Sequence, residues 1–352
     1  MKRHLRDAAI QLAVASAAVV LALAVGGVMI IAHGHNPFSV YATLFSESLG
    51  NPMSLGQILF KTTTLVFTGV AAAFAFRAGM FNIGGEGQLY LGAFVCAMAG
   101  LWLPAGTPGV VAVPILVLAA FLGGALAAVP PAILKATRGT HEVINTMMMN
   151  FILMAVVNYF LNRVNVETTV HTRPILASGR LPLLSSGVEA MRGSDGNASL
   201  LLAVIACAAA WYLFARTRTG YELRAVGFSP RAAEYGGVSV PRAMVLSLVV
   251  SGGLAGLGGI NTVMGSQGYF EEGFAPGMGY LGIAVALLAR NHPIGVIPAA
   301  FLFALLSEGG QVINQFVPKE MGEILQAIVI IFVVVGARLL QVALQQRRSA
   351  HA

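Results

Sequence analysis

Long uncharged stretches separated by short charged segments dominate the chain. The stretch Ala8–Ala32 contains no charged residue, and Gly87–Leu134 is about twice as long. An α-helix needs about 20 apolar residues to cross the hydrocarbon core of a bilayer, so the longer stretch holds enough residues for two spans. The turn signal at Pro104–Gly109 separates them. This pattern predicts an all-α, polytopic membrane protein rather than a soluble domain.

The whole chain, 1–352, is interpreted as a single transmembrane domain with about ten spans. The predicted spans are Ala8–Ala32, Leu55–Phe76, two helices within Gly87–Leu134, Val143–Asn162, Gly196–Ala215, Ala243–Phe270, Gly273–Ala289, Asn291–Ser307 and Met321–Ala337. The first is longer than the apolar core of a signal peptide, which is about 7–15 residues, so we interpret it as a retained membrane anchor. Two loops are long enough to have a function, an outer loop 161–197 and an inner loop 216–242.

Composition supports a membrane location. Hydrophobic residues make up 57% of the chain and charged residues only 10%, against about 25% charged residues in a soluble domain. The net charge is +7, but the basic residues are scattered between apolar runs rather than gathered in a nucleic-acid-binding tract. Alternating the spans from a cytoplasmic N-terminus puts most Lys and Arg residues inside, so both termini are predicted to be cytoplasmic.

The sequence contains few signals for metal, redox or nucleotide chemistry. Cys96 and Cys207 lie within apolar runs and are predicted to be buried core residues. No CxxC or HExxH spacing occurs, so no metal site is predicted. The small-residue run Gly252–Gly259 predicts close helix packing. It lacks the GxxxxGK[ST] pattern, so this chain is not expected to bind ATP through a Walker motif.

Two glycine-rich segments occupy matching places in the predicted topology. Residues 77–88 follow the second span and residues 265–279 follow the seventh, and both carry carboxylates and amides. Transporters built from inverted repeats have interrupted helices at such places, which predicts opposite halves at about 1–215 and 216–352. The alternative is two ordinary turns between helices.

The inner loop predicts two short helices. The first lies around Glu222–Val226 and breaks at Gly227, and the second starts at a Ser229 cap with Pro230 in its first position and ends at Gly236. Such a pair makes a docking surface for another protein. The alternative is a solvated, charged loop.

Four motifs carry a resemblance to a known family. The inner-loop segment Gly220–Gly237 resembles the coupling loop of ABC importer permeases for ribose, branched-chain amino acids and nucleosides. Residues 77–88 are similar to the F-N-I-G-x-E-G-Q signature of the nucleoside and simple-sugar branch. Residues 139–150 and 279–290 resemble two further elements of that branch, with departures at His141, Met149 and Ala289.

The resemblance implies a ten-helix permease of the vitamin B12-importer-like (type II) fold with an inverted 5+5 repeat. It implies a non-enzymatic transport subunit for nucleosides in the bacterial inner (plasma) membrane. Implied partners are an ABC ATPase subunit that binds ATP and Mg²⁺, a second permease subunit and an extracytoplasmic substrate-binding protein. This chain itself would bind no cofactor. The alternatives are a permease for a simple sugar such as ribose, an ion-driven secondary transporter or a membrane-embedded enzyme.

The candidate functional residues form two sets. The set implied for ATPase coupling is Glu222, Leu223, Arg224, Gly227, Pro230, Ala232 and Ala233. The set proposed for the substrate pathway, because polar groups within a membrane are costly and aromatic rings stack on bases, is Asn82, Glu86, Gln88, Thr146, Asn150, Gln267, Glu271, Phe81 and Tyr280.

Helical spacing adds detail to the second set. Glu142, Thr146 and Asn150 share one helix face. The alternative for Glu142 is an ion pair with Arg138. The alternatives for Glu271 and Glu272 are solvated side chains or part of a docking rim for the binding protein. The alternative for Asn150 is a hydrogen bond between helices.

Overall fold

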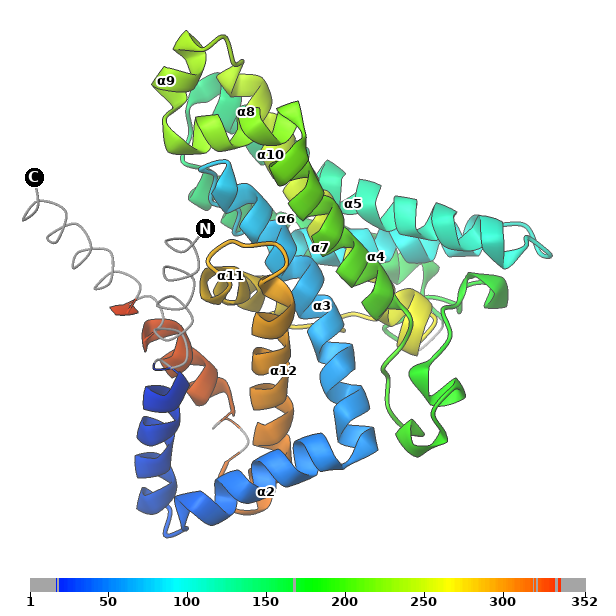
Figure 1. The fold of residues 1–352 in the computed structure, drawn as a ribbon. Coiled ribbons are helices and arrows are strands. Elements are labelled where there is room, and N and C mark those ends of the chain that lie inside the picture. Colours follow the sequence, from blue (N-terminus) through cyan, green and yellow to red (C-terminus); the bar gives the residue numbers. More distant parts are fainter. Residues whose placement is uncertain are drawn as a thin grey trace, which may run out of the picture. The chain divides into compact units, whose positions relative to one another are not determined.

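The computed structural model describes residue 17 and residues 19–166, 169–318, 320, 322–332 and 335–336. Within these ranges the regular structure is helical, and only three isolated β-bridges occur. The all-α prediction is therefore confirmed. The helices (Figure 1) are Val19–Ala32, α2 (Pro37–Gly50), α3 (Pro52–Arg77), α4 (Gly85–Trp102), α5 (Gly109–Arg138), α6 (Glu142–Val164), α7 (Ser199–Arg216), α8 (Arg218–Phe228), α9 (Pro230–Tyr235), α10 (Val240–Leu257), α11 (Met278–Leu288), α12 (Val296–Val312) and Gly322–Phe332.

Several of these helices can cross a membrane. Among the described residues, 6 helices are long and apolar enough, or up to 7 if the bent pair Val19–Ala32 and α2 forms one span. The helices α11 and Gly322–Phe332 are apolar but shorter. The chain is therefore a polytopic membrane protein, while the count of ten spans stays a prediction. The predicted spans Ala8–Ala32 and Met321–Ala337 lie partly outside the described residues.

The predicted boundaries hold where turn signals are strong. α4 ends at Trp102 and α5 begins at Gly109, which confirms the division at Pro104–Gly109. The predicted eighth span was too long, because Gly273–Ala289 is helical only from Met278. Gly273 and Gly277 adopt positive φ angles of 71° and 78°. Glycine adopts positive φ angles readily, but they are incompatible with a right-handed α-helix, so the helix does not extend across these residues.

The chain divides into two units, Gly56–Phe301 and Met1–Leu55 with Leu302–Ala352. In the smaller unit, Val19–Ala32 and α2 meet at a bend of 116°. A cluster of buried apolar side chains forms its core: Ile30, Val40, Leu44, Ile313 and Val317.

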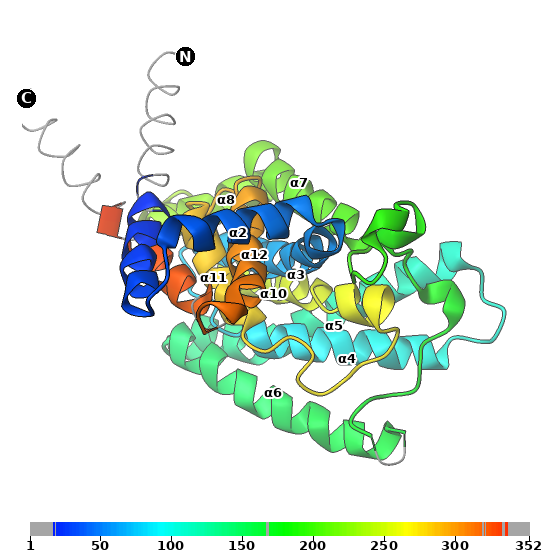
Figure 2. The same ribbon diagram turned by 90° about the horizontal axis from the view of Figure 1, so that it is seen from below.

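In the larger unit, α10 packs against α5 and α4, and α4 also packs against α6 and α11 (Figure 2). Small residues bring the backbones together: a Cβ added to Gly124 of α5 would lie 2.2 Å from the carbonyl oxygen of Gly252 in α10. The close packing predicted for Gly252–Gly259 is confirmed. Cys96 and Cys207 are buried and free of disulfides, as expected of core residues.

The long loop 161–197 packs on the segment that follows α10. This segment begins with a π-helix, Asn261–Ser266. The loop contains three short 3₁₀-helices, Ala177–Gly179, Leu184–Ser186 and Glu189–Met191. Thr172 N donates to Phe270 O at 2.9 Å, and Leu181 N donates to Met264 O at 2.7 Å. These bonds fix the loop to the larger unit.

Candidate functional site

A buried amide pair lies between α3 and α4. The side chains of Asn82 and Gln88 exchange two hydrogen bonds of 2.9 and 3.1 Å. Asn82 Nδ2 also donates to Ser251 Oγ of α10 at 2.8 Å. Asn82 and Gln88 are 3% and 1% exposed, so the pair satisfies polar groups that would be costly to bury alone. The predicted residues Asn82 and Gln88 therefore hold α10 against the start of α4.

One face of α6 binds the backbone of residues 83–87, next to this amide pair. Ile83 N donates to Thr146 Oγ1 at 3.1 Å, and Gly87 N donates to Asn150 Oδ1 at 2.9 Å. Asn150 Nδ2 donates in turn to Ile83 O at 3.0 Å. Thr146 and Asn150 are fully buried. The shared inward face of Thr146 and Asn150 is as predicted, and their polar atoms are engaged by the backbone of residues 83–87.

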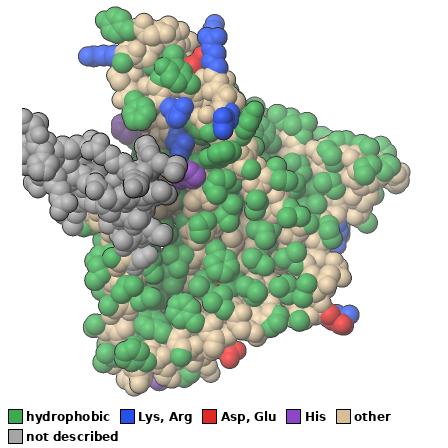
Figure 3. All heavy atoms as spheres, in the orientation of Figure 1, with side chains coloured by type: hydrophobic (Ala, Val, Ile, Leu, Met, Phe, Trp, Pro, Cys, Tyr) green, Lys and Arg blue, Asp and Glu red, His purple; other side chains and the backbone are tan. Residues whose placement is uncertain are grey.

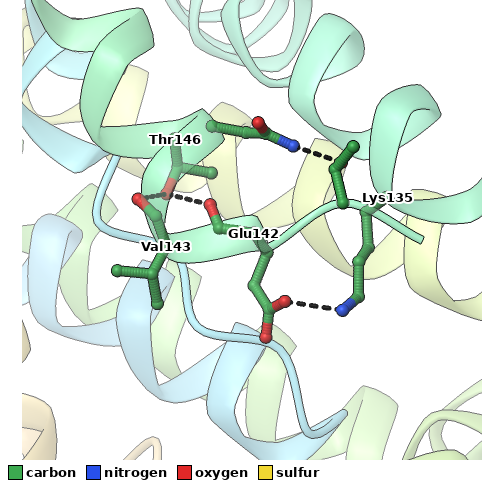
Figure 4. A network of polar contacts seen from close by, with 6 residues as sticks. Lys135, Glu142, Val143 and Thr146 are labelled. Carbon is green, nitrogen blue, oxygen red and sulfur yellow. Dashed lines mark hydrogen bonds and ion pairs between the residues drawn. The ribbon is translucent and has the colours of Figure 1, made fainter. Parts of the chain in front are cut away.

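Glu142 begins this helix and forms an ion pair. Its partner is Lys135 of α5, with Nζ 2.7 Å from Oε2 (Figure 4), rather than the Arg138 considered above. Hydrogen bonding and the positive charge of Lys135 stabilise the carboxylate, and both side chains are mostly buried. This pair joins the end of α5 to the start of α6 across the Gly139 turn. The backbone of Gly139 closes α5 in the left-handed region, with φ of 64°.

Glu86 joins the two glycine-rich segments. Its carboxylate accepts hydrogen bonds from Gly277 N at 2.6 Å and Gly279 N at 2.7 Å. These donors lie at the N-terminus of α11, where unpaired N–H groups and the helix dipole favour negative charge. A Cβ added to Gly279 would lie 2.3 Å from Glu86 N, so only glycine permits this approach. The N-termini of α4 and α11 thus meet at one buried carboxylate.

A pocket opens beside this junction. Tyr90 of α4 donates its hydroxyl hydrogen to Asn158 Oδ1 of α6 at 2.7 Å, and Asn158 Nδ2 donates to Glu272 Oε1 at 2.6 Å. The ring of Phe274 lies parallel to that of Tyr90, with centroids 6.1 Å apart. Other residues lining the pocket are Glu86, Leu89, Met154, Gly273, Ala275 and Pro276. The pocket therefore combines aromatic faces, an amide and a carboxylate.

Sequence reasoning missed Asn158 and Phe274. Asn158 continues the four-residue spacing of Glu142, Thr146 and Asn150, so the helical periodicity contained the signal. Phe274 lies in the predicted span Gly273–Ala289, and the sequence did not indicate toward which side of that span its ring points. Tyr280 contacts the same region, since its hydroxyl accepts from Asn150 Nδ2 at 2.9 Å.

Among the nine predicted pathway residues, only Glu86 lines this pocket. Gln267 Nε2 donates to Glu271 Oε2 at 2.9 Å. The backbone of Glu271 also forms an isolated β-bridge with His171 of the long loop, so Gln267 and Glu271 belong to the contact between that loop and the segment after α10. Phe81 packs against Phe76, with ring centroids 4.7 Å apart.

The inner loop forms the predicted pair of short helices. Ala232 N donates to Ser229 Oγ at 3.3 Å, Pro230 occupies the first turn of α9, and Gly236 follows its last residue. The prediction of a break at Gly227 was wrong, because α8 continues to Phe228. Gly227 instead contacts the end of α3: a Cβ there would lie 2.4 Å from Arg77 O. This glycine allows α8 to touch the turn that leads into residues 82–88.

The exposed face of this helix pair carries two aromatic side chains that are not in the predicted coupling set. Leu223 and Ala233 are 1% and 6% exposed and point into the protein, whereas Phe228 and Tyr235 are 90% and 94% exposed. Glu222 is occupied by an ion pair with Arg218 at 2.9 Å. Exposed aromatic rings on a surface helix are typical of interaction sites. Figure 3 shows basic side chains gathered at this end of the molecule.

The sequence matches a family model over most of its length. The family is described as the permease component of the branched-chain amino acid transport system, and the match covers residues 54–334. The chain belongs to this family. This polytopic helical chain is therefore a permease component.

Curated relatives extend over nearly the whole permease. The guanosine ABC transporter permease protein NupP of Bacillus subtilis is 36% identical, covering 90% of this chain and 91% of the relative. The nucleoside ABC transporter permease protein NupB of Lactococcus lactis is 34% identical, covering 90% and 89%. The glucose ABC transporter permease protein TsgB13 of Haloferax volcanii is 35% identical, covering 90% and 85%. No solved structure matches.

Proposed function

We propose that this permease is the transmembrane subunit of a bacterial ABC importer for nucleosides. Its near full-length similarity to nucleoside and guanosine permeases of two bacteria is the observation that carries the proposal. In this proposal it is not an enzyme, since ATP and Mg²⁺ bind to a partner ATPase and an extracytoplasmic binding protein delivers the substrate. The protein lies in the plasma membrane with ten spans, both termini in the cytoplasm, and the type II fold with inverted halves 1–215 and 216–352.

The pocket beside Glu86 supports a nucleoside as the substrate class. A nucleoside combines a flat aromatic base with ring donors, ring acceptors and ribose hydroxyls. Tyr90 and Phe274 offer aromatic faces to the base, while Asn158 and Glu272 offer an amide and a carboxylate to its polar edge. In this proposal the wall of the pathway consists of α4, α6 and the segment before α11.

A paralogue is the favoured second permease subunit. Both bacteria contain another nucleoside or guanosine permease that matches this chain more weakly, at 27% identity in Lactococcus lactis and 24% in Bacillus subtilis. Two permeases of unequal similarity in each organism support a heterodimer in which this chain takes the place of the NupB- or NupP-like member.

The contacts suggest how ATPase movement reaches the pathway. Phe228 and Tyr235 contact the ATPase, and its closure moves α8. The contact between Gly227 and Arg77 passes this movement to the turn before residues 82–88. Glu86 then carries it to α11 through Gly277 and Gly279. Alternating access follows from movement of the two interrupted helices around this carboxylate.

Reconstitution tests the proposal. The permease, its paralogue, the ATPase and the binding protein are placed in proteoliposomes, and nucleosides, glucose and ribose are compared for uptake and stimulated ATP hydrolysis. We expect ATP-dependent nucleoside uptake, with the Asn158→Ala and Glu272→Gln variants reducing it. A matched control is Glu189→Gln, an exposed carboxylate of the long loop, which is expected to leave uptake unchanged.

A simple sugar is the second candidate substrate, because the glucose permease of Haloferax volcanii is as similar as the nucleoside permeases. Stimulation by glucose or ribose but by no nucleoside would favour it. Uptake that needs an ion gradient and no ATPase would instead indicate a secondary transporter.

A further inference from the structure

Two adjoining cavities lie where α7 ends and α10 begins. The first, the headgroup pocket, is lined among others by Arg218, Arg242, Ser239 and Glu222. The second, the acyl groove, is lined among others by Tyr212, Leu213, Phe74 and Val250. Thr219, Leu223 and Leu246 line both cavities. The two cavities therefore adjoin at these three residues, and one is charged while the other is apolar.

Their position relative to the bilayer follows from the flanking helices. Ser199–Arg216 and Val240–Ser266 are both candidate membrane spans, and both reach the charged end of the cavities. Trp211 and Tyr212 are 40% and 59% exposed one turn before the end of α7. Trp and Tyr are enriched at the level of lipid headgroups, with Arg and Lys just beyond. The headgroup pocket thus lies at the membrane surface, and the acyl groove extends from the headgroup level at Tyr212 toward the hydrocarbon region at Val250.

The charge of the pocket selects an anion. Arg218 uses its Nε to bind Glu222 at 2.9 Å, which leaves its terminal nitrogens available. Arg242 is exposed, and no hydrogen bond or ion pair joins it to another residue in the described part of the chain. A guanidinium pairs with a phosphate through two parallel hydrogen bonds. Two arginines against one carboxylate give the pocket a net positive charge.

The apolar acyl groove fits a long hydrocarbon chain. The acyl groove runs between the exposed faces of α7 and α10, where Leu246 is 40% exposed. An apolar groove that adjoins a basic pocket matches a molecule with a phosphate at one end and a fatty acyl chain at the other. We propose that this site binds an anionic phospholipid, with its phosphate between Arg218 and Arg242 and an acyl chain along Leu246 and Val250. The proposal does not depend on which substrate the permease transports.

Native mass spectrometry of the purified full-length permease tests this site. Dioleoyl phosphatidylglycerol and dioleoyl phosphatidylcholine are added in equal amounts, and retained lipid is counted. We expect preferential retention of phosphatidylglycerol. The Arg242→Gln variant is expected to bind it about tenfold more weakly, because one charge-assisted contact to phosphate is lost. Arg231→Gln is the matched control, since Arg231 is an exposed arginine of α9 that lines neither cavity.

A second variant, at an apolar residue, tests the acyl groove without a change of charge. Leu246→Trp fills the acyl groove without changing charge, and it is expected to reduce phosphatidylglycerol retention as well. Size-exclusion chromatography and thermal melting of each variant report folding. Equal retention of the two lipids by the wild type, or equal losses in Arg242→Gln and Arg231→Gln, would overturn the proposal. So would displacement of the lipid on addition of the ATPase subunit, because the pocket would then belong to that protein interface.

Discussion

Replacing Glu86 is expected to release the N-terminus of α11. The Glu86 side chain is 5% exposed, and both of its carboxylate oxygens accept backbone hydrogen bonds, from Gly277 N and Gly279 N. Glu86→Ala removes both acceptors and leaves the N–H groups of half-buried Gly277 and buried Gly279 without these partners. Glu86→Gln keeps one carbonyl acceptor and turns an amide donor toward the second N–H group.

The size of the effect follows from these two bonds. Each unsatisfied buried donor costs about 1–3 kcal/mol, so Glu86→Ala is expected to lower the free energy of unfolding by roughly 2–6 kcal/mol. Loss of negative charge at the helix N-terminus adds to this cost. Glu86→Gln is expected to cost about half as much, since one of the two bonds survives. Thermal melting in lipid nanodiscs tests this. The melting temperature is expected to be lowest for Glu86→Ala, higher for Glu86→Gln and highest for the wild type.

A neighbouring carboxylate supplies the control. Glu271→Gln removes a charge from the same segment, but Glu271 accepts its hydrogen bond from the flexible side chain of Gln267 and is only half-buried. We expect a small change in melting temperature for this variant. If Glu86→Ala melts no lower than Glu271→Gln, the carboxylate does not hold α11 in place and the reasoning fails.

Three further predictions concern other contacts. Asn150→Ala is expected to lower the melting temperature by leaving Gly87 N and Ile83 O unpaired, at about 1–3 kcal/mol each; unchanged melting would contradict this. Gly124→Ala is expected to separate α5 from α10 at a cost of about 1–3 kcal/mol, whereas Gly50→Ala, whose Cβ meets nothing within 4 Å, should melt like the wild type. Phe228→Ala with Tyr235→Ala is expected to reduce ATPase co-purification without changing melting, and undiminished co-purification would refute the proposed contact.

Local patterns in the sequence determined most of the secondary structure. The break between α4 and α5 follows from Pro104–Gly109, and the start of α9 follows from Ser229 and Pro230, because turns and caps depend on residues a few positions apart. The inward face of Thr146 and Asn150 follows from helical spacing in the same way. The membrane environment follows from the small number of charges.

The tertiary structure alone decided which polar groups meet. Glu86 and Gly277 are 191 residues apart along the chain, and nothing local to either one indicates that they bind. Gly227 was predicted to end a helix, but its role is the close contact with Arg77 O. Leu223 and Ala233 of the predicted coupling set are buried, and the exposed aromatic residues Phe228 and Tyr235 were not in that set. Sequence periodicity specifies which side chains share a helix face, whereas only the packing of helices specifies what that face touches.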